Sequence, residues 1–486
     1  MEATEQKPKL TAADVDACVR VLQAVAADRS LMAELDEPRR RALMMAAGLV
    51  SRPHRHERKQ LIKAFRRQER AAQRAHDSIL IKRTVNRSAR TSLSFVLPAS
   101  TAHEPHAGAL PPVENAAPRE ELLRPRSCYV CKHEYQQVHH FYDSLCPPCA
   151  ELNYRKRFQT APLDGRVILV TGARIKIGYQ ASLMLLRAGA HVIATTRFPR
   201  DAAQRFARES DFAVWSDRLE LHALDLRHIP NVERFARHLL DTAPRLDAII
   251  NNAAQTVRRP PQFYQHLRAV EEQPLDALPA NVRPLLRGAS PDAPPASALE
   301  LRAPLDPAFP PGALDLDDQQ IDLRPVNSWR LTLGEVPTVE LLEVHLVNAV
   351  APFVLNAKLK PLMLRHRSFD KHIVNVSAME AQFSRNKKTD KHPHTNMAKA
   401  ALNMMTRTSA PDYAQDGIYM NSVDTGWITD EDPLIHVARK QVEHDFHPPL
   451  DAIDGAARIL DPLFSGFINN RHEWGLFFKD YRPVSW

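Results

Sequence analysis

Apolar residues follow two different patterns along the chain. Over residues 11–50 they recur at intervals of three and four, which predicts two short helices, and a long basic helix follows over about residues 55–81. Further on, short unbroken apolar runs at 165–171 and 191–196 predict buried strands of a parallel sheet, with a helix between them. The chain is therefore predicted to begin as a helical region and to continue as an alternating strand–helix domain.

Changes in composition divide the chain into four segments. These are a helical, basic region, a linker rich in Pro and Ala, a cysteine module and an α/β domain, at residues 1–97, 98–125, 126–160 and 161–486. An insertion at about residues 255–338 interrupts the last domain. Its prolines, ten between Pro274 and Pro311, predict that this part is a flexible loop.

The net charge of +8 resides in one segment. Residues 51–90 contain 13 Lys or Arg and 3 Asp or Glu, whereas the rest of the 486-residue chain carries −2. One interpretation is a solvated amphipathic helix that packs Leu61, Ile62, Phe65 and the apolar residues 79–81. The other is a contact with nucleic acid or another acidic partner over residues 55–90, because clustered basic residues supply the electrostatic footprint for it.

Targeting signals are not evident in the sequence. The start, MEATEQKPKL, lacks the apolar stretch of a signal peptide, and no run of about 18 apolar residues predicts a membrane span. We therefore expect a cytoplasmic protein whose cysteines are reduced.

Four of the five cysteines form two Cys-x2-Cys pairs. The pairs are Cys128 with Cys131 and Cys146 with Cys149, and 14 residues separate them. This is the spacing of a structural zinc site, in which two turns supply four thiolates to a closed tetrahedral shell. Four unrelated buried cysteines or a redox dithiol are the alternatives, although the sequence around Cys146 lacks the βαβ context of a redox motif. We predict that the four residues bind structural Zn²⁺.

A glycine-containing turn joins the first predicted strand to the helix behind it. The turn spans residues 171–178 (TGARIKIG), in a chain with only 14 Gly. A strand, a glycine turn and a helix in this order are the setting of a dinucleotide-binding loop, where the helix N-terminus receives the diphosphate. The next strand ends at Arg197, and a basic residue there favours the 2′-phosphate of NADP(H).

Further motifs follow this turn in a consistent order. They are LDL, IINNAA, NAVAPF, IVNVS and NSVDTGWIT, at residues 224–226, 249–254, 348–353, 373–377 and 421–429. With them, residues 164–435 resemble the short-chain dehydrogenase/reductase (SDR) family. The resemblance implies an α/β fold, a doubly wound parallel-sheet Rossmann domain, that binds NADP(H) or NAD(H).

The loop and the resemblance together predict the cofactor contacts. The residues concerned are Gly172, Arg174, Lys176, Ile177, Gly178, Arg197, Asp225, Leu226, Asn252, Ala253, Lys399, Ile428 and Thr429. Lys176 stands where the family has the middle glycine of the loop. Either this lysine reaches the phosphates as a point charge, or it reshapes the loop.

The catalytic pattern of the family is incomplete. Asn348 and Lys399 match it, but Thr395 stands where the family has its tyrosine, and Ser377 is followed by Ala378 instead of a second serine. An aliphatic hydroxyl is far less acidic than a phenol, so Thr395 cannot donate a proton in the same way. His394 is the best alternative acid; a loop histidine without such a role is the other interpretation.

These departures leave different functions open. One hypothesis is an NAD(P)(H)-dependent oxidoreductase of a carbonyl or alcohol substrate, with NADP(H) favoured and with His394, Tyr264 or water in place of the family tyrosine. The alternative is a catalytically silent dinucleotide-binding module, and a third possibility is a non-redox reaction. Arg258, Arg259 and Tyr264 follow the fourth strand and are candidates for contacting a small-molecule substrate. The resemblance also implies a homo-oligomer built through the helices that flank Lys399.

Overall fold

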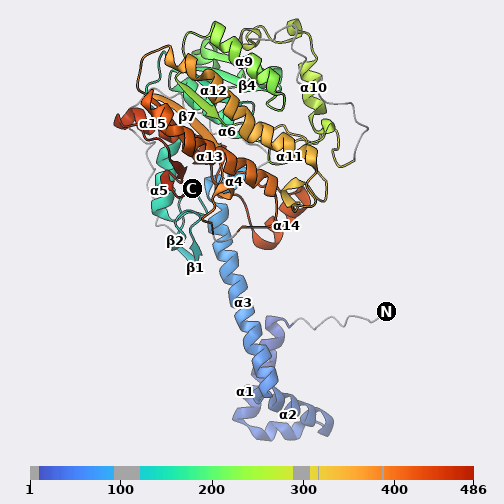
Figure 1. The fold of residues 1–486 in the computed structure, drawn as a ribbon. Helices are drawn as coiled ribbons and strands as arrows, with labels where there is room; N and C mark the ends of the chain where they lie inside the picture. The colour runs from blue at the N-terminus through green and yellow to red at the C-terminus, as the bar shows by residue number, and fades with distance from the viewer. Residues whose placement is uncertain (1–9, 92–120, 288–306, 316, 386–387) are drawn as a thin grey trace. The chain divides into compact units, whose positions relative to one another are not determined.

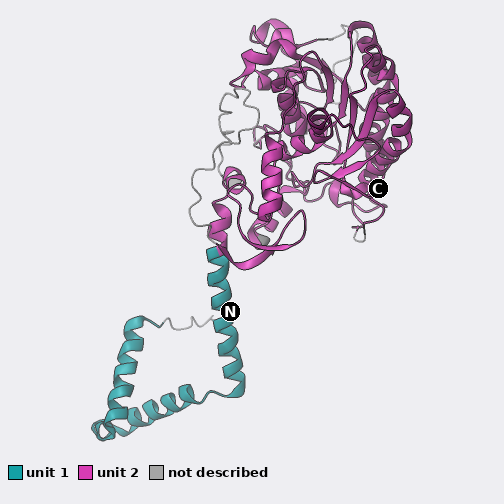
Figure 2. Ribbon diagram, turned by 90° about the vertical axis from the view of Figure 1, so that its left-hand side faces the viewer, with its two compact units in different colours: residues 1–76 teal, residues 77–486 magenta. Residues whose placement is uncertain are grey.

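The computed structural model describes residues 10–91, 121–287, 307–315, 317–385 and 388–486. Contacts divide the chain into two compact units, residues 1–76 and residues 77–486 (Figure 2). The boundary lies inside helix α3 (Arg55–Lys82), not in the linker predicted at 98–125. Residues 98–120 of that linker lie outside the described residues, and the last five belong to a strand, β1.

The first unit consists of helices. They are α1 (Ala12–Ala27), a 3-10 turn (Arg29–Glu34), α2 (Glu37–Ser51) and the first part of α3. Thr11 begins α1 with a reciprocal cap, since its hydroxyl accepts from the Asp14 N–H while the Asp14 carboxylate accepts from the Thr11 N–H. In α3, Leu61, Ile62 and Phe65 are exposed, so the predicted packing is not found at these side chains. At the end of the helix Ile79 is exposed as well, but Leu80 and Ile81 are buried as predicted.

An eight-stranded sheet forms the centre of the second unit. Its order is β10-β9-β8-β7-β6-β3-β4-β5, and every neighbouring pair is parallel except β10 with β9. The strands are β3 (Val167–Thr171), β4 (His191–Thr196), β5 (Leu219–Ala223), β6 (Ala248–Asn251), β7 (Lys371–Ser377), β8 (Ile418–Asp424), β9 (Phe477–Lys479) and β10 (Arg482–Val484). Since β3 lies between β4 and β6, the chain reverses its direction of winding at the C-terminal end of β3. The doubly wound sheet expected from the sequence is confirmed.

Helices cover both faces of this sheet (Figure 1). One hydrophobic cluster joins the sheet to α6 (Lys176–Arg187), α7 (Pro199–Phe206), α8 (Phe212–Trp215) and α15 (Ala452–Asn469). A second cluster joins the other face to α9 (Ile229–Thr242), α12 (Ala351–Leu364) and α13 (Pro393–Gln415). Strand residues alternate between the two clusters, so β3 sends Ile168 and Val170 to one and Val167 and Leu169 to the other.

One helical stretch among the described residues, Thr338–Leu364, is apolar and long enough to span a membrane by length and composition. It comprises α11 (Thr338–His345), a π-helical turn η8 (Leu346–Val350) and α12. Leu355, Leu359 and Leu362 of this stretch are fully buried against the sheet. Such packing is typical of a core helix.

The structure describes part of the predicted insertion. Its described residues include 3-10 turns, helix α10 (Gln265–Glu271) and a bridge between Leu286 and Leu221 beside β5. Residues 288–306, the centre of the predicted flexible loop, lie outside the described residues. A further helix, α14 (Leu434–His444), follows β8.

The cysteine module belongs to the second unit. Its elements are the antiparallel pair β1 (Glu121–Ser127) and β2 (Glu134–Gln137), and helix α5 (Pro147–Arg157). Pro147 and Pro148 occupy the first positions of α5, where a missing N–H costs little. Helix α5 lies beside α15 (Figure 1), and α4 (Val85–Thr91) contacts the module through the Val85 and Asn86 N–H groups.

Candidate functional site

Two glycines of the turn between β3 and α6 stand where no side chain fits. A Cβ on Gly172, which has φ +71°, would lie 2.8 Å from the Ala253 Cα, and one on Gly178 would lie 2.2 Å from the Gly172 oxygen. Lys176 has φ +53°, so the lysine keeps the left-handed backbone that favours glycine. The turn therefore has the backbone shape of a dinucleotide loop although its middle glycine is absent.

A cavity of about 390 Å³ opens at this turn. It lies at the C-terminal ends of β3, β4 and β6, where parallel sheets bind ligands at a reversal of winding. Most of the predicted cofactor residues line it: Gly172, Arg174, Lys176, Ile177, Gly178, Arg197, Asp225, Leu226, Asn252, Ala253 and Thr429. Lys399 and Ile428 are described residues that do not line it.

Two arginines lie at the end of the cavity formed by β4 and β5. The half-buried Arg197 guanidinium lies 4.3 Å from the centre of the Tyr264 ring, and Tyr264 lines the same cavity. Arg227 donates to the Asp225 carboxylate at 2.6 Å. Burial opposes ionisation of Asp225, but Arg227 and Arg197 outweigh it and keep the pKa of this carboxyl below its ordinary value.

Carboxylates face the basic residues of the loop. Arg174 forms an ion pair with Asp201 at 2.9 Å. Glu431 lines the cavity, where burial opposes its ionisation, but Lys176 and Arg259 outweigh it and keep the pKa of the carboxyl low. The positive charges of the cavity are thus balanced by protein carboxylates.

Asn348 and Lys399 are held by backbone groups. The Asn348 amide, in the π-helical turn η8, accepts from the Gln255 N–H and donates to the Gln255 oxygen, both at 2.8 Å. On α13, the Lys399 amine donates to the Val376 oxygen of β7 at 2.7 Å, and burial lowers the pKa of this lysine to about 8. Lys399 therefore carries a proton that it releases readily.

Three further catalytic candidates have buried polar atoms without a hydrogen-bond partner in the described part of the chain. They are the hydroxyls of Ser377 and Thr395 and both ring nitrogens of His394. The His394 Nε2 lies 4.0 Å from a carboxylate oxygen of Glu340, and that carboxylate accepts from the Arg258 N–H at 2.8 Å. Burial lowers the pKa of His394, while Glu340 opposes this shift.

The end of the predicted insertion covers these positions. Trp329 stacks on His392 with ring centres 3.9 Å apart, and the His392 N–H donates to the Leu331 oxygen at 2.9 Å. All five predicted catalytic residues, Asn348, Ser377, His394, Thr395 and Lys399, are described and buried, and none of them lines the cavity.

The two arginines predicted to contact substrate are paired with carboxylates. Arg258 lies 3.2 Å from Glu343, and Arg259 forms an ion pair with Asp322. Arg259 lines the cavity together with Tyr264, while Arg258 does not. Their contact with a substrate stays a prediction.

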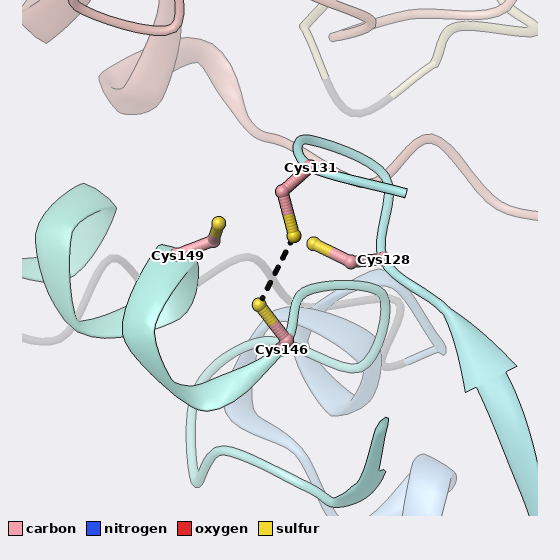
Figure 3. A group of neighbouring side chains, drawn as sticks. All are labelled: Cys128, Cys131, Cys146 and Cys149. Carbon is pink, nitrogen blue, oxygen red and sulfur yellow. Dashed lines mark hydrogen bonds between the residues drawn. The ribbon is translucent and has the colours of Figure 1, made fainter. Parts of the chain in front are cut away.

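The four predicted metal ligands lie together (Figure 3). Their Sγ atoms all lie within 4.8 Å of one another, and Cys131 and Cys146 are 3.5 Å apart. Zinc–sulfur bonds of about 2.3 Å would place the sulfurs somewhat less than 4 Å apart, so this donor set fits a tetrahedral ion. Burial opposes ionisation of Cys128, but the backbone N–H groups that it accepts from outweigh burial and lower its pKa to about 7. A thiolate is available there for a metal.

Sequence reasoning missed several residues of the site. Glu340, Glu431 and Arg227 were not singled out, although Arg227 directly follows the LDL motif and Glu431 lies two residues after Thr429. Their positions next to predicted motifs were the available signal. Glu340 had none, since only the packing of α11 on α13 brings it to His394.

Family models of two descriptions match the chain. The one for short chain dehydrogenase matches residues 166–273, and the one for enoyl-(acyl carrier protein) reductase matches residues 330–442. An uncharacterized protein, R665, of Acanthamoeba polyphaga mimivirus is 30% identical over 70% of this chain and 71% of its own length. Dehydrogenase/reductase SDR family member 13 of Bos taurus is 36% identical, and retinol dehydrogenase 13 of Mus musculus 31%. The matches cover 22% and 19% of this chain but only 26% and 28% of those two dehydrogenases.

Solved structures show the same kind of likeness. A short chain dehydrogenase from Shigella flexneri is 18% identical and aligns over 68% of this chain and 98% of its own, with a TM-score of 0.42. A short-chain dehydrogenase from Streptomyces avermitilis is 19% identical over 60% of this chain and 81% of its own, with a TM-score of 0.38.

Proposed function

Because the chain belongs to the short-chain dehydrogenase/reductase family, we propose that it is an NADP(H)-dependent oxidoreductase of a small carbonyl or alcohol substrate. The observation that carries this proposal is the cradle at the end of β3. A Cβ on Gly178 would collide with the Gly172 oxygen, so the first turn of α6 packs directly on the strand end, as the last glycine of a dinucleotide loop allows. We place the dinucleotide in the cavity that this turn lines.

Different residues of the cavity would bind different parts of the dinucleotide. The loop and the N-terminus of α6 would receive the diphosphate, with Lys176 as a nearby positive charge. Arg197, at the end of β4, would take the 2′-phosphate that distinguishes NADP(H) from NAD(H). Thr429, which also lines the cavity, would lie beside the nicotinamide, as the family resemblance implies.

Proton transfer is assigned to His394. A bound nicotinamide supplies or accepts a hydride, so carbonyl reduction also requires a proton at the substrate oxygen. Thr395 cannot give that proton readily, whereas an imidazolium can. Glu340 would favour the protonated His394 ring. The Lys399 cation, held by the Val376 oxygen, would stabilise negative charge on the substrate oxygen.

A binding and turnover experiment tests this proposal. NADPH and NADH are titrated by fluorescence, and oxidation of NADPH is then followed with a panel of aldehydes and ketones. Submicromolar to micromolar NADPH binding with turnover is expected, and Lys399→Ala should abolish the turnover. Turnover that survives Lys399→Ala contradicts the assignment of the site, and a failure of NADPH to bind contradicts the function itself.

One observation favours a second function, a catalytically silent dinucleotide-binding module. All five catalytic positions are buried, the end of the insertion packs on the neighbouring His392, and Thr395 stands where the family has its tyrosine. Such a protein would bind NADPH tightly and turn over no substrate of the panel. Those two results together would replace the oxidoreductase by this alternative.

Zinc is the metal proposed for the four cysteines, since four thiolates and no carboxylate form a closed site of the structural type. Metal analysis of the purified chain should give about one zinc per chain, and Cys128→Ser should lose it. Iron in place of zinc would contradict the choice of metal.

The remaining parts of the proposal concern partners and place. The basic helix over residues 55–90 is proposed to meet an acidic partner or nucleic acid, which a salt-dependent shift in a binding assay would test. Cytoplasmic localisation and a homo-oligomer are proposed as well. Cell fractionation and light scattering test them.

A further inference from the structure

The cysteine module shares a buried polar interface with the start of α15. Arg157 of α5 is 8% exposed and donates to Asp451 and Asp454 at 2.7 and 2.9 Å. Tyr142, from the turn between the two cysteine pairs, donates its hydroxyl to the fully buried Asp454 at 2.5 Å. Removing one partner of a buried ion pair leaves an uncompensated charge and strongly destabilises the fold. This interface therefore holds the module and α15 in one arrangement.

The first cysteine turn also contacts the segment after β8. Tyr129 lies between Cys128 and Cys131, and its hydroxyl accepts from the Trp427 N–H at 2.9 Å. Thr429, two residues further on, lines the dinucleotide cavity. The turn that carries two metal ligands therefore fixes the backbone next to the cavity.

Ile177 links the module to the dinucleotide loop. It lines the cavity and also packs on the hydrophobic cluster of the module, which contains Leu145, Ile428 and Leu450. A Cβ on Gly455 of α15 would lie 2.8 Å from the Ile177 side chain, so the backbone of α15 lies directly on it. A displacement of the module or of α15 would therefore shift Ile177 and the dinucleotide loop.

We propose that the cysteine module supports the dinucleotide site from behind, with Tyr129 and Ile177 as positioning residues, so that metal and dinucleotide bind cooperatively. The inference rests on the proposed dinucleotide binding. Metal at the four cysteines keeps the turn at Tyr129 and the cluster around Ile177 in place. Linkage is reciprocal, so the dinucleotide must then strengthen metal binding by the same factor.

The module depends on the metal for its shape. Its cluster is small and includes the side chains of Cys128 and Cys146, and the four thiols make no disulfide among the described residues. A metal that joins two distant turns supplies folding free energy that so small a cluster cannot supply alone. Without it, we expect the turn at Tyr129 to loosen before the sheet does.

The experiment measures binding of NADPH to the full chain with zinc bound and after its removal by a chelator under reducing conditions. The Kd of NADPH should rise about tenfold on removal, while circular dichroism of the sheet and its helices stays nearly unchanged. In competition with a chelator, saturating NADPH should raise zinc affinity by the same factor. Equal NADPH affinity with and without zinc overturns this inference alone, whereas no NADPH binding to the zinc-loaded chain overturns the proposed function too.

A paired substitution separates coupling from loss of the metal. Tyr129→Phe keeps all four cysteines, so zinc content should be unchanged while the Kd of NADPH rises about fivefold through loss of one hydrogen bond. Tyr135→Phe is the matched control, because that hydroxyl donates to the Asp143 oxygen within the module at 2.6 Å. Equal effects of the two variants on the Kd of NADPH overturn the role of Tyr129.

Discussion

The dinucleotide cavity and the catalytic positions lie in one domain but keep the family pattern to different degrees. Around the cavity, Gly172 and Gly178 remain, and Lys176 keeps the backbone conformation of the glycine that it replaces. At the catalytic positions, Lys399 matches the pattern that the resemblance implies, whereas Thr395 stands where that pattern has a tyrosine. Dinucleotide binding depends on backbone shape, which one unusual side chain does not destroy. Proton transfer depends on the identity of one side chain, so losing it requires another donor.

His394→Asn tests the catalytic positions, and its effect on kcat should be the largest among these variants. Because a general acid contributes about 10²–10⁴-fold, the kcat of carbonyl reduction should fall by that order while the Kd of NADPH stays the same. Burial lowers the pKa of His394, so the wild-type rate should decrease as pH rises through a value below the ordinary 6.5. Stopped-flow rates between pH 5 and 8 measure both effects.

Glu340→Gln is the companion variant, since Glu340 opposes the lowering of the His394 pKa. Without that carboxylate the pKa should fall further, and the decrease in rate should move to lower pH. A pH profile that His394→Asn and Glu340→Gln both leave in place would assign the proton to another donor.

Gly178→Ala tests the other side of the comparison. The new Cβ would lie 2.2 Å from the Gly172 oxygen and 2.4 Å from the Asn252 amide nitrogen. The Kd of NADPH should therefore rise about a hundredfold, equivalent to about 2.7 kcal/mol. Gly334→Ala is the control, because a Cβ there meets no described atom within 4 Å and the backbone φ is not positive. Calorimetry of both variants decides whether the cradle binds the ligand.

Arg197→Ser should change the choice of cofactor. If this guanidinium holds the 2′-phosphate, the Kd of NADPH should rise about tenfold or more, whereas that of NADH should change little. Arg187→Ser is a suitable control, since Arg187 lies in the last turn of α6 and pairs with Glu209 and Asp211 away from the cavity. An equal loss for both dinucleotides would place the 2′-phosphate elsewhere.

Local patterns made the fold and the loop predictable from the sequence. Unbroken apolar runs at β3 and β4 indicated buried parallel strands, and the cysteine spacing indicated the metal site. The contacts that connect these parts could not be predicted, because they join residues far apart in the chain. Tyr129 and Trp427 are 298 positions apart, and Trp329 stacks on His392 across 63 positions of the chain. The predicted packing of the basic helix is found at Leu80 and Ile81 but not at Leu61 or Phe65, since amphipathic spacing does not say where along a helix a packing partner lies.

Lys399→Met separates function from stability, and its expected change in the free energy of unfolding is the smallest energetic effect among these variants. Burial lowers the pKa of this lysine to about 8 from its model-peptide value of 10.5, so below pH 8 the folded chain carries the cost of a buried cation. Methionine removes that cost but also the hydrogen bond to the Val376 oxygen. At pH 7 the free energy of unfolding should rise by on the order of 1 kcal/mol, while turnover is lost.

The stability difference should depend on pH. Between pH 8 and 10.5 the unfolded lysine holds a proton that the folded one has released, so wild-type stability increases and the advantage of the variant shrinks. Lys360→Met should lower the free energy of unfolding at pH 7, because Asp412 and Asp416 raise the pKa of Lys360 despite its partial burial and the charged lysine therefore stabilises the fold. Denaturant titrations at pH 7 and 10 distinguish the two variants.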